Sequence, residues 1–591
     1  MNAEWSLDVL YKGFDDPKFQ EDFKQVDEVC AEANAFAASL PGGDAKENLL
    51  TYIRLQEKMA SMIYTMGLYA NLRQSVNTSD SESVAYLGQL MAKAAGTTKA
   101  DTIAKKYIAS LENLEELIDS DPLLKEYEFM LKQLKEDDKY SLSDQAEEVI
   151  ARFNISGGGG WSDLQSYLTS TVQAEYRGEK ITLSAVRNLA YDSDPQVRKD
   201  AYEAELACYD KIKDSVAFAL NNIKLQVINA AQMRGFASPL AETLYKSRLQ
   251  KETLDALMES IKEYLPMFRS YMKAKAEYLG HENGLPWYDL FAPVGGGEGR
   301  KFTAEEARNY LVELFGGFDQ DLADMIARAF DEEWIDFYPR EGKVGGAFCA
   351  GLPLQKQSRI LTNFDGTLSD VDTLAHELGH AYHNLNIEDH RILNSDYTMP
   401  VAETASTFNE NVVMGAAVAG ATEPAERFAL LEGQLMEVNQ IICDIYSRYL
   451  FETAVFQRRA GEFMFADELS KIMLDAQKQA YGDGMDQEVR HPYMWVCKGH
   501  YYSTGNSFYN FPYAFGGLLA RGLYAKYKEE GAAFVPKYRE MLHATPVTSC
   551  EGAAMIAGID LTKKEFWQMS LKSYEKEINE YIQLAKQLKK S

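Results

Sequence analysis

Apolar residues recur at spacings of three and four along most of the chain, which is the repeat of a helix with one buried face. The clearest stretches are residues 47–72, 82–111 and 251–279, which are rich in Ala, Leu, Glu, Lys and Met. Proline occurs only 16 times in 591 residues, so it rarely interrupts this pattern. The pattern therefore predicts a mostly α protein, long enough to bury a large core.

Residues 343–354 and 358–366 do not follow the helical repeat. Short apolar runs alternate there with glycine and proline, which predicts two short strands joined by turns. The pair is either an ordinary structural hairpin or a sheet edge that holds an extended peptide by backbone hydrogen bonds. The pattern alone leaves both open.

A helix is predicted next, from residue 369 to about residue 385. Ser369 and Asp372 have the spacing of a capping box at its start. At about 100° per residue, its apolar side chains fall on one side and its histidines roughly opposite. The apolar residues are Val371, Leu374, Leu378 and Leu385, and the histidines are His376, His380 and His383. This helix thus points an imidazole face away from the core.

Composition and charge narrow the function classes. The chain has 89 acidic and 61 basic residues, a formal charge of −28, whereas nucleic acids and anionic membranes need a cationic partner surface. The sequence has no run of about 18 apolar residues, no secretory pattern at its start and no C-x-x-C pair among its six cysteines. We expect a cytoplasmic protein with no nucleic-acid or membrane partner.

Histidines are rare in this chain, and half of them lie close together in the sequence. Only eight histidines occur, four of them between residues 376 and 390. His376 and His380 frame Glu377 in an H-E-x-x-H pattern. Two histidines four apart on a helix can bind one Zn²⁺, and the intervening glutamate stands near the metal's open position. Zinc lowers the pKa of its bound water, and Glu377 would accept that water's proton as it attacks a carbonyl.

A third zinc ligand is expected on a second helix, because the metzincin and thermolysin-like spacings do not fit the residues after His380. Pro400 suits the first turn of such a helix, which places Glu403 and Glu410 on one face. We predict Glu403 as the ligand and Glu410 as a carboxylate behind it that orients a zinc-bound histidine. For His383, a place behind the ligands, in a channel wall or in the structural core all stay open.

These segments resemble the oligoendopeptidase F group of the thimet-oligopeptidase-like zinc metallopeptidases. The resemblance rests on HELGH at 376–380 and AETAS at 402–406, whose glutamate follows the second histidine by 23 residues. It extends over about 330–520, through WIDFYPR at 334–340, GAFC at 346–349, LTNFDG at 361–366, HYY at 500–502 and FYNFPY at 508–513.

The resemblance implies a large helical ellipsoid with a deep substrate channel, zinc on its floor, and a small β-sheet beside the catalytic helix. It implies an N-terminal helical region over residues 1–190 and a catalytic domain over 191–591. The substrate backbone would pair with the strand that holds Gly346, Ala347, Phe348 and Cys349. The segment 500–513 would close over the substrate, where His500 with Tyr509 or Tyr513 stabilises the oxyanion.

We therefore predict a zinc metalloendopeptidase with one Zn²⁺ per chain, which cleaves internal bonds of short unstructured oligopeptides. Glu377 is the general base and then the proton donor to the leaving amine. One alternative is a carboxypeptidase or dipeptidyl carboxypeptidase, in which Arg340, Arg391 or Lys498 fixes the terminal carboxylate of the substrate. Another is a catalytically inactive peptide-binding scaffold. The oligomeric state stays open.

Overall fold

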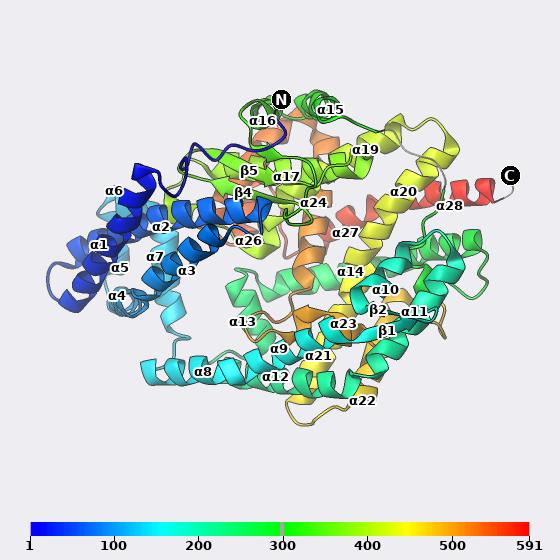
Figure 1. Cartoon of the computed structure of the whole chain (residues 1–591), viewed down its shortest axis with the longest axis horizontal. Helices are drawn as coiled ribbons and strands as arrows, with labels where there is room; N and C mark the ends of the chain where they lie inside the picture. The colour runs from blue at the N-terminus through cyan, green and yellow to red at the C-terminus, as the bar shows by residue number, and fades with distance from the viewer. Residues whose placement is uncertain (1, 296–300, 590–591) are drawn as a thin grey trace.

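A computed structural model describes residues 2–295 and 301–589. Helices dominate it, and its strands form two small sheets, which confirms the prediction of a mostly α protein (Figure 1). In the part of the chain that the structure describes, no helix is long and apolar enough to cross a membrane.

Seven helices form the N-terminal part, at the left of Figure 1: α1 (Pro17–Ser39), α2 (Ala45–Val76), α3 (Ser81–Ala95), α4 (Thr98–Ser110), α5 (Leu114–Asp119), α6 (Pro122–Glu126) and α7 (Glu128–Asp138). The predicted helix 82–111 is wrong in one respect. It is interrupted at Gly96 and Thr97, where α3 ends and α4 begins.

The middle of the chain contains α8 (Asp144–Ser156), α9 (Gly158–Thr171), the hairpin of β1 (Gln173–Tyr176) and β2 (Glu179–Thr182), α10 (Leu183–Asn188), η1 (Leu189–Tyr191), α11 (Pro195–Asp210), α12 (Lys213–Met233), α13 (Pro239–Lys246), α14 (Lys251–Leu279) and η2 (Trp287–Asp289). Helix α14 has the predicted bounds. Its buried residues recur every three or four positions, and it ends where Gly280 takes a left-handed conformation with φ of 92°.

The remaining elements begin with α15 (Ala304–Gly316), α16 (Gln320–Asp331), β3 (Ile335–Asp336), β4 (Phe348–Leu352), β5 (Gln357–Leu361), α17 (Leu368–Ile387), η3 (Ile392–Asn394), α18 (Met399–Ala402), α19 (Thr404–Gly420) and α20 (Pro424–Asn439). They continue with the π-helix η4 (Gln440–Asp444), α21 (Ile445–Arg459), α22 (Ala466–Tyr481), η5 (Gly482–Gly484), α23 (Met494–Cys497) and η6 (Gly499–Tyr502). The last are α24 (Phe511–Glu530), η7 (Gly531–Ala533), α25 (Val535–Ala544), η8 (Thr545–Val547), α26 (Cys550–Ile556), α27 (Lys564–Lys572) and α28 (Glu575–Leu588).

The sheet beside α17 has the strand order β3-β5-β4. Strands β4 and β5 are the two predicted strands and pair antiparallel, whereas the two-residue β3 pairs parallel with β5 and was not predicted. Because side chains alternate along a strand, the sheet serves two cores. Leu352 and Leu361 pack with the N-terminal helices, while Cys349 and Ile360 pack on the larger core that contains α17. β4 is left as an edge strand beside α17.

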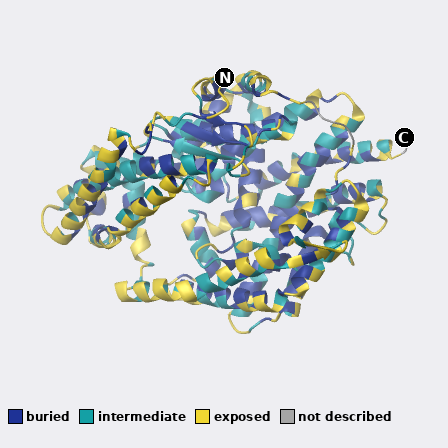
Figure 2. Cartoon of the chain, viewed as in Figure 1, coloured by how far each residue is buried: buried dark blue, intermediate teal, exposed yellow. Residues whose placement is uncertain are grey.

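Burial follows this arrangement (Figure 2). The larger core extends from β1 through α28 and encloses most of α14, α19 and α24. Two smaller cores hold the N-terminal helices together and against the sheet. Helix α8 has no buried residue and projects from the lower left of the molecule in Figure 2.

Candidate functional site

The N-cap of helix α17 lies two residues earlier than predicted. Thr367 is its N-cap, with extended backbone angles (φ −74°, ψ 163°), and its hydroxyl accepts a hydrogen bond from the amide of Asp370. The carboxylate of Asp370 in turn accepts one from the amide of Thr367 at 2.9 Å. The predicted capping box of Ser369 and Asp372 is therefore wrong, because both residues already lie inside the helix.

His376, His380 and Glu403 come together at one point. Their ligand atoms all lie within 4.8 Å of one another. The Nε2 atoms of His376 and His380 stand 3.2 and 3.3 Å from the same Oε2 atom of Glu403. The two imidazole planes are nearly perpendicular, at 81°. Two imidazole nitrogens and a carboxylate oxygen that converge in this way are a donor set that suits Zn²⁺.

Glu403 lies between two helices, at an interruption that the sequence did not predict. Helix α18 ends at Ala402 and α19 begins at Thr404, so Glu403 adopts φ −90° and ψ 9° between them. This bridge region of backbone space is sparsely populated and recurs at active sites. The hydroxyl of Ser406 donates a hydrogen bond to Oε2 of Glu403 at 2.8 Å. The interruption and this hydrogen bond together aim the carboxylate at the two histidines.

Gly379, inside the H-E-x-x-H motif, allows α17 and α19 to approach closely. A Cβ atom on Gly379 would lie 2.5 Å from the Cα of Ser406 and 2.6 Å from the carbonyl oxygen of Ala405. A buried hydrogen bond at 3.0 Å, from the amide of Asn409 to the carbonyl of Ala375, ties the same two helices together. The missing side chain thus sets the distance between the histidines and Glu403.

Glu410 accepts a hydrogen bond from Nδ1 of His376 at 2.7 Å, which leaves Nε2 of this ring facing Glu403. Burial alone would lower the pKa of His376, but the hydrogen bonds to Glu403 and Glu410 raise it well above its usual range. Burial would raise the pKa of Glu403, but His376 and His380 hold it far below its usual range. The cluster therefore stabilises a negative carboxylate next to its imidazoles.

Glu377 is nearly inaccessible, with 5% of its surface exposed, yet it lines the same cavity as the two histidines. Burial raises the pKa of its carboxyl group, and the charges of His376 and His380 oppose this shift. A glutamate whose pKa is moved toward neutrality is suited to exchange protons.

A cavity of about 500 Å³ opens beside this cluster. One wall is α17, from His376 past Asn384 to Glu388, and the facing wall is β4. Ala347, Phe348 and Cys349 line this cavity. Gly346 does not, and its carbonyl accepts a hydrogen bond from Asn363 at 2.8 Å. Three of the four residues predicted to bind substrate thus line the cavity, but only Phe348 and Cys349 belong to a strand, because β4 begins at Phe348.

His383 lies behind the cavity. It is fully buried, its Nε2 atom is 2.8 Å from the hydroxyl oxygen of Thr545, and its ring stacks on Tyr397 with centroids 3.9 Å apart. Tyr397 lines the cavity and separates His383 from it. Burial lowers the pKa of His383 to about 3, so the ring is neutral. An influence of His383 on the metal ligands stays a prediction.

His500, Tyr509 and Tyr513 form an aromatic cluster of their own. The ring of His500 lies 5.0 Å from that of Tyr509 and 6.1 Å from that of Tyr513. None of the three lines the 500 Å³ cavity. Helix α24 nevertheless brings the cluster toward the ligands, because a Cβ atom on Gly516, one turn after Tyr513, would lie 3.5 Å from the Cβ of Glu403.

The three cations considered for a terminal carboxylate differ in their partners. Arg340 makes two hydrogen bonds to Asp336, at 2.6 and 2.9 Å, and Arg391 pairs with Glu57. Lys498 forms no side-chain hydrogen bond or ion pair with any described residue. Two of the three candidates are therefore already neutralised.

The sequence did not point to several cavity residues. Asn384 follows His380 by four positions, so the helical repeat that placed the histidines could have placed it as well. Tyr64 comes from α2 and donates a hydrogen bond to the carbonyl of Gly351 at 2.9 Å. No local signal links a residue of α2 to a strand almost 300 positions later.

Comparison with known proteins agrees with this geometry. The model of peptidase family M3 matches residues 188–572, and the model of oligopeptidase F matches residues 109–173. The oligopeptidase PepF of Bacillus subtilis is 24% identical over 99% of this chain and 88% of its own length. The chromosomal oligoendopeptidase F of Lactococcus lactis subsp. cremoris is 25% identical over 92% of this chain and 91% of its own.

Solved structures share the fold. The oligoendopeptidase-F of Enterococcus faecium superimposes with a TM-score of 0.71 at 19% identity, over 96% of this chain and 99% of its own. A structure from Chlamydophila abortus gives 0.86 at 21% identity, over 98% of both chains. The chain therefore belongs to peptidase family M3, within its oligopeptidase F group, and is a metallopeptidase.

Proposed function

We propose that this metallopeptidase is a zinc endopeptidase that hydrolyses internal bonds of short, unstructured oligopeptides. The observation that carries the proposal is the convergence of His376, His380 and Glu403 on one point, with the buried Glu377 in the same cavity. The family places the chain among peptidases, and its relatives named oligoendopeptidase F support the endopeptidase choice.

His376, His380 and Glu403 would hold one Zn²⁺ per chain. When bound, the ion supplies a Lewis acid that polarises a peptide carbonyl and lowers the pKa of water. Glu410 fixes the His376 ring through Nδ1, and Ser406 fixes the carboxylate of Glu403. These supporting contacts maintain the geometry of the donor atoms.

Glu377 performs the proton transfers. Its carboxylate takes a proton from the attacking water and passes it to the amine that leaves when the peptide bond breaks. Burial supports this role, because it raises the pKa of Glu377 and so makes its carboxylate a better proton acceptor.

The oxyanion that develops on the peptide carbonyl needs a donor from the protein. We propose His500 with Tyr509 or Tyr513 for this role. Their rings form one cluster on the Glu403 side of the site, outside the 500 Å³ cavity. The proposal therefore includes an approach of the segment 500–513 when a peptide binds.

The substrate backbone would pair with β4, which is the edge strand of its sheet. Ala347, Phe348 and Cys349 lie beside the metal cluster for this purpose. A cavity of about 500 Å³ accepts a segment of extended chain but no folded domain, which limits the substrates to oligopeptides.

We also propose that residues 1–190 form an N-terminal region and residues 191–591 the catalytic domain. The separate matches of the two family models, at 109–173 and 188–572, support a boundary in this area.

A carboxypeptidase or dipeptidyl carboxypeptidase is the second candidate, and the observation that favours it is Lys498, which forms no ion pair with any residue that the structure describes. The inactive scaffold has less support, because Glu377 and all three proposed ligands are in place.

The test is digestion of a random oligopeptide mixture, half of it amidated at the C-terminus, with product analysis by mass spectrometry. We expect chelator-sensitive cleavage at internal bonds in both halves, with a limit on peptide length. Cleavage confined to the free-acid half, at a fixed distance from the C-terminus, would replace the endopeptidase by the exopeptidase. No cleavage by the zinc-loaded chain would leave only the scaffold.

A further inference from the structure

A second cavity, of about 380 Å³, lies between α10, α11, η2 and η4. It is distinct from the cavity beside the metal cluster, and the two share no lining residue. Its wall mixes aromatic rings, such as Tyr191 and Phe291, with the charged side chains of Arg187, Asp444 and Lys498. Such a mixture of apolar surface and a few placed polar groups is typical of a ligand site.

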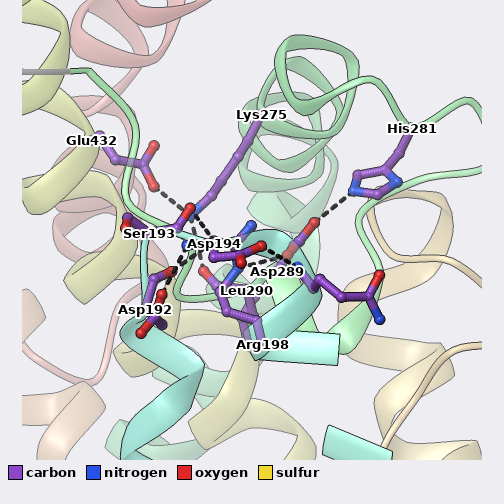
Figure 3. A network of polar contacts seen from close by, with 10 residues as sticks. Asp192, Ser193, Asp194, Arg198, Lys275, His281, Asp289, Leu290 and Glu432 are labelled. Carbon is purple, nitrogen blue, oxygen red and sulfur yellow. Dashed lines mark hydrogen bonds and ion pairs between the residues drawn. The ribbon is translucent and has the colours of Figure 1, made fainter. Parts of the chain in front are cut away.

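One side of this cavity is held by a buried polar network (Figure 3). Arg198 donates to Asp289 at 2.8 Å and to the carbonyl oxygen of Asp192 at 2.6 Å. Nε2 of His281 lies 2.6 Å from the second oxygen of Asp289. Lys275 donates to Glu432 and to the carbonyl oxygen of Leu290, which lines the cavity. The network joins α11, α14, η2 and α20. Within it, the carboxylate of Asp289 neutralises the charge of Arg198.

The other charges of the wall are paired too, with one exception. Arg187 lies 3.2 Å from Glu205, and Asp444 pairs with Arg448. Lys498 has no such partner among the residues that the structure describes, although its side chain is half-buried and lines the cavity. A charge that leaves bulk water without a partner is costly, so an unpaired ammonium group in a cavity calls for an anionic ligand.

The local backbone also marks this place. The π-helix η4 interrupts the run from α20 into α21 and places Gln440 and Asp444 in the cavity wall. Single turns of π-helix are rare, and those that do occur are often found at functional sites. Here the turn aligns one wall of the cavity opposite α10.

Lys498, which lines the cavity, is also close in sequence to the segment that is proposed to act on the substrate. This residue precedes His500 by two positions, and His500 belongs to the aromatic cluster with Tyr513. Burial lowers the pKa of His500, and the cations of Arg448 and Lys498 lower it further, so both cations lie within electrostatic reach of the His500 ring. Lys498 therefore lies close to the aromatic cluster that is proposed to stabilise the oxyanion.

We propose that Lys498 is the centre of a subsite that binds a carboxylate of the peptide substrate, either its C-terminal carboxylate or an acidic side chain. The subsite rests on the proposed peptidase function and deepens it, because it gives the enzyme a preference for peptides with a carboxylate at a set distance from the scissile bond.

The net negative charge of the protein makes a local cation important for the binding of anionic peptides. With a formal charge of −28, the protein as a whole repels anionic peptides. A half-buried cation that forms no ion pair with a described carboxylate is the position where such a peptide gains a charge-assisted hydrogen bond. Arg340 and Arg391 do not compete, because Asp336 and Glu57 already occupy them.

The test uses zinc-loaded enzyme and one internally quenched peptide in matched forms. The first pair differs only in a free or amidated C-terminus, and further pairs replace Glu by Gln at single positions on the C-terminal side of the cut. Variants are Lys498→Gln, the conservative Lys498→Arg, and Lys478→Gln as a matched control. Lys478 is an exposed lysine of α22 outside the cavity wall.

We expect wild-type enzyme to lose at least tenfold in kcat/KM, mainly through KM, when the recognised carboxylate is removed. K498Q should show the same loss with the unmodified peptide and no further loss with the modified one. K498R should retain part of the discrimination, and K478Q should match wild type. The matched peptide pair whose two members are cleaved at different rates identifies the recognised carboxylate as either the C-terminus or a side chain.

A wild-type enzyme that cleaves all forms equally well, or a K498Q variant that discriminates as wild type does, would overturn the inference. A failure of the proposed function looks different, because either no form would then be cleaved in a chelator-sensitive way, or only free-acid forms would be cleaved, at a fixed distance from the C-terminus. If K498Q does not fold, calorimetric binding of the free-acid and amidated peptides to Glu377→Gln protein decides. Equal affinities for every matched pair would refute the subsite.

Discussion

The substitution Gly379→Ala tests how the fold positions the metal ligands. Its new methyl group would lie 2.5 Å from the Cα of Ser406, whereas ordinary van der Waals contacts begin at 3.4 Å. The colliding atoms belong to the backbone of α19 and cannot rotate away, so α17 and α19 must separate by 0.9 Å. Glu403, at the start of α19, then moves relative to His376 and His380.

The expected cost has two parts. Overpacking of this kind destabilises a protein by about 1–3 kcal/mol. The better helix propensity of alanine returns about 1 kcal/mol, which leaves a net loss of about 0–2 kcal/mol. The effect on catalysis should be larger, because a misplacement of about 1 Å can cost about 100-fold in rate.

The assay compares denaturant unfolding, bound zinc and kcat/KM for Gly379→Ala and Gly433→Ala. Gly433 is an interior residue of α20, where a Cβ atom meets no described atom within 4 Å. We expect the control to keep full activity and to gain up to about 1 kcal/mol. If Gly379→Ala is as stable, as zinc-loaded and as active as the control, the close approach of α17 and α19 does not set the site.

Three further predictions concern side chains around the site. Glu410→Gln should weaken zinc binding by about 10- to 100-fold in a chelator-competition titration, because the His376 ring loses its orienting carboxylate, while the exposed Glu426→Gln should not. Unchanged zinc affinity would remove Glu410 from this role. His383, with a folded-state pKa of about 3 against an ordinary value near 6.5, should contribute stability above pH 6.5 that is lost as the pH falls, by about 1.4 kcal/mol per unit between roughly pH 6 and pH 3. His383→Gln should therefore flatten the acid side of the unfolding free energy against pH, and an unaltered slope would contradict this. His500→Gln should lower kcat by about 100-fold or more with zinc content intact, and a normal kcat would exclude His500 from oxyanion stabilisation.

Local patterns in the sequence were sufficient for helix α14 and for the two histidines of the metal cluster. The bounds of α14 follow from a regular apolar repeat that ends at Gly280, where the backbone turns left-handed. His376 and His380 were found because the four-residue spacing and the helical repeat coincide on one face. Both signals are local, and the tertiary structure preserves them.

Other features depend on contacts between distant segments. The helix predicted over 82–111 divides at Gly96, where the apolar repeat continues across a turn. The interruption at Glu403 and the two-residue strand β3 depend on contacts with residues distant in the sequence, so no local pattern predicts them. The same holds for Lys498, whose lack of a carboxylate partner becomes visible only when the charges of α10, α11 and α21 are placed around it.

The central claim is that Glu377, beside a metal held by His376, His380 and Glu403, carries out peptide hydrolysis. The most direct measurement is kcat for one oligopeptide with zinc-loaded Glu377→Gln protein, alongside its zinc content. The account predicts full zinc occupancy and a kcat reduced by about 100-fold to 10,000-fold, the usual contribution of a general acid–base residue. Cleavage at the wild-type rate by the zinc-loaded variant would contradict it.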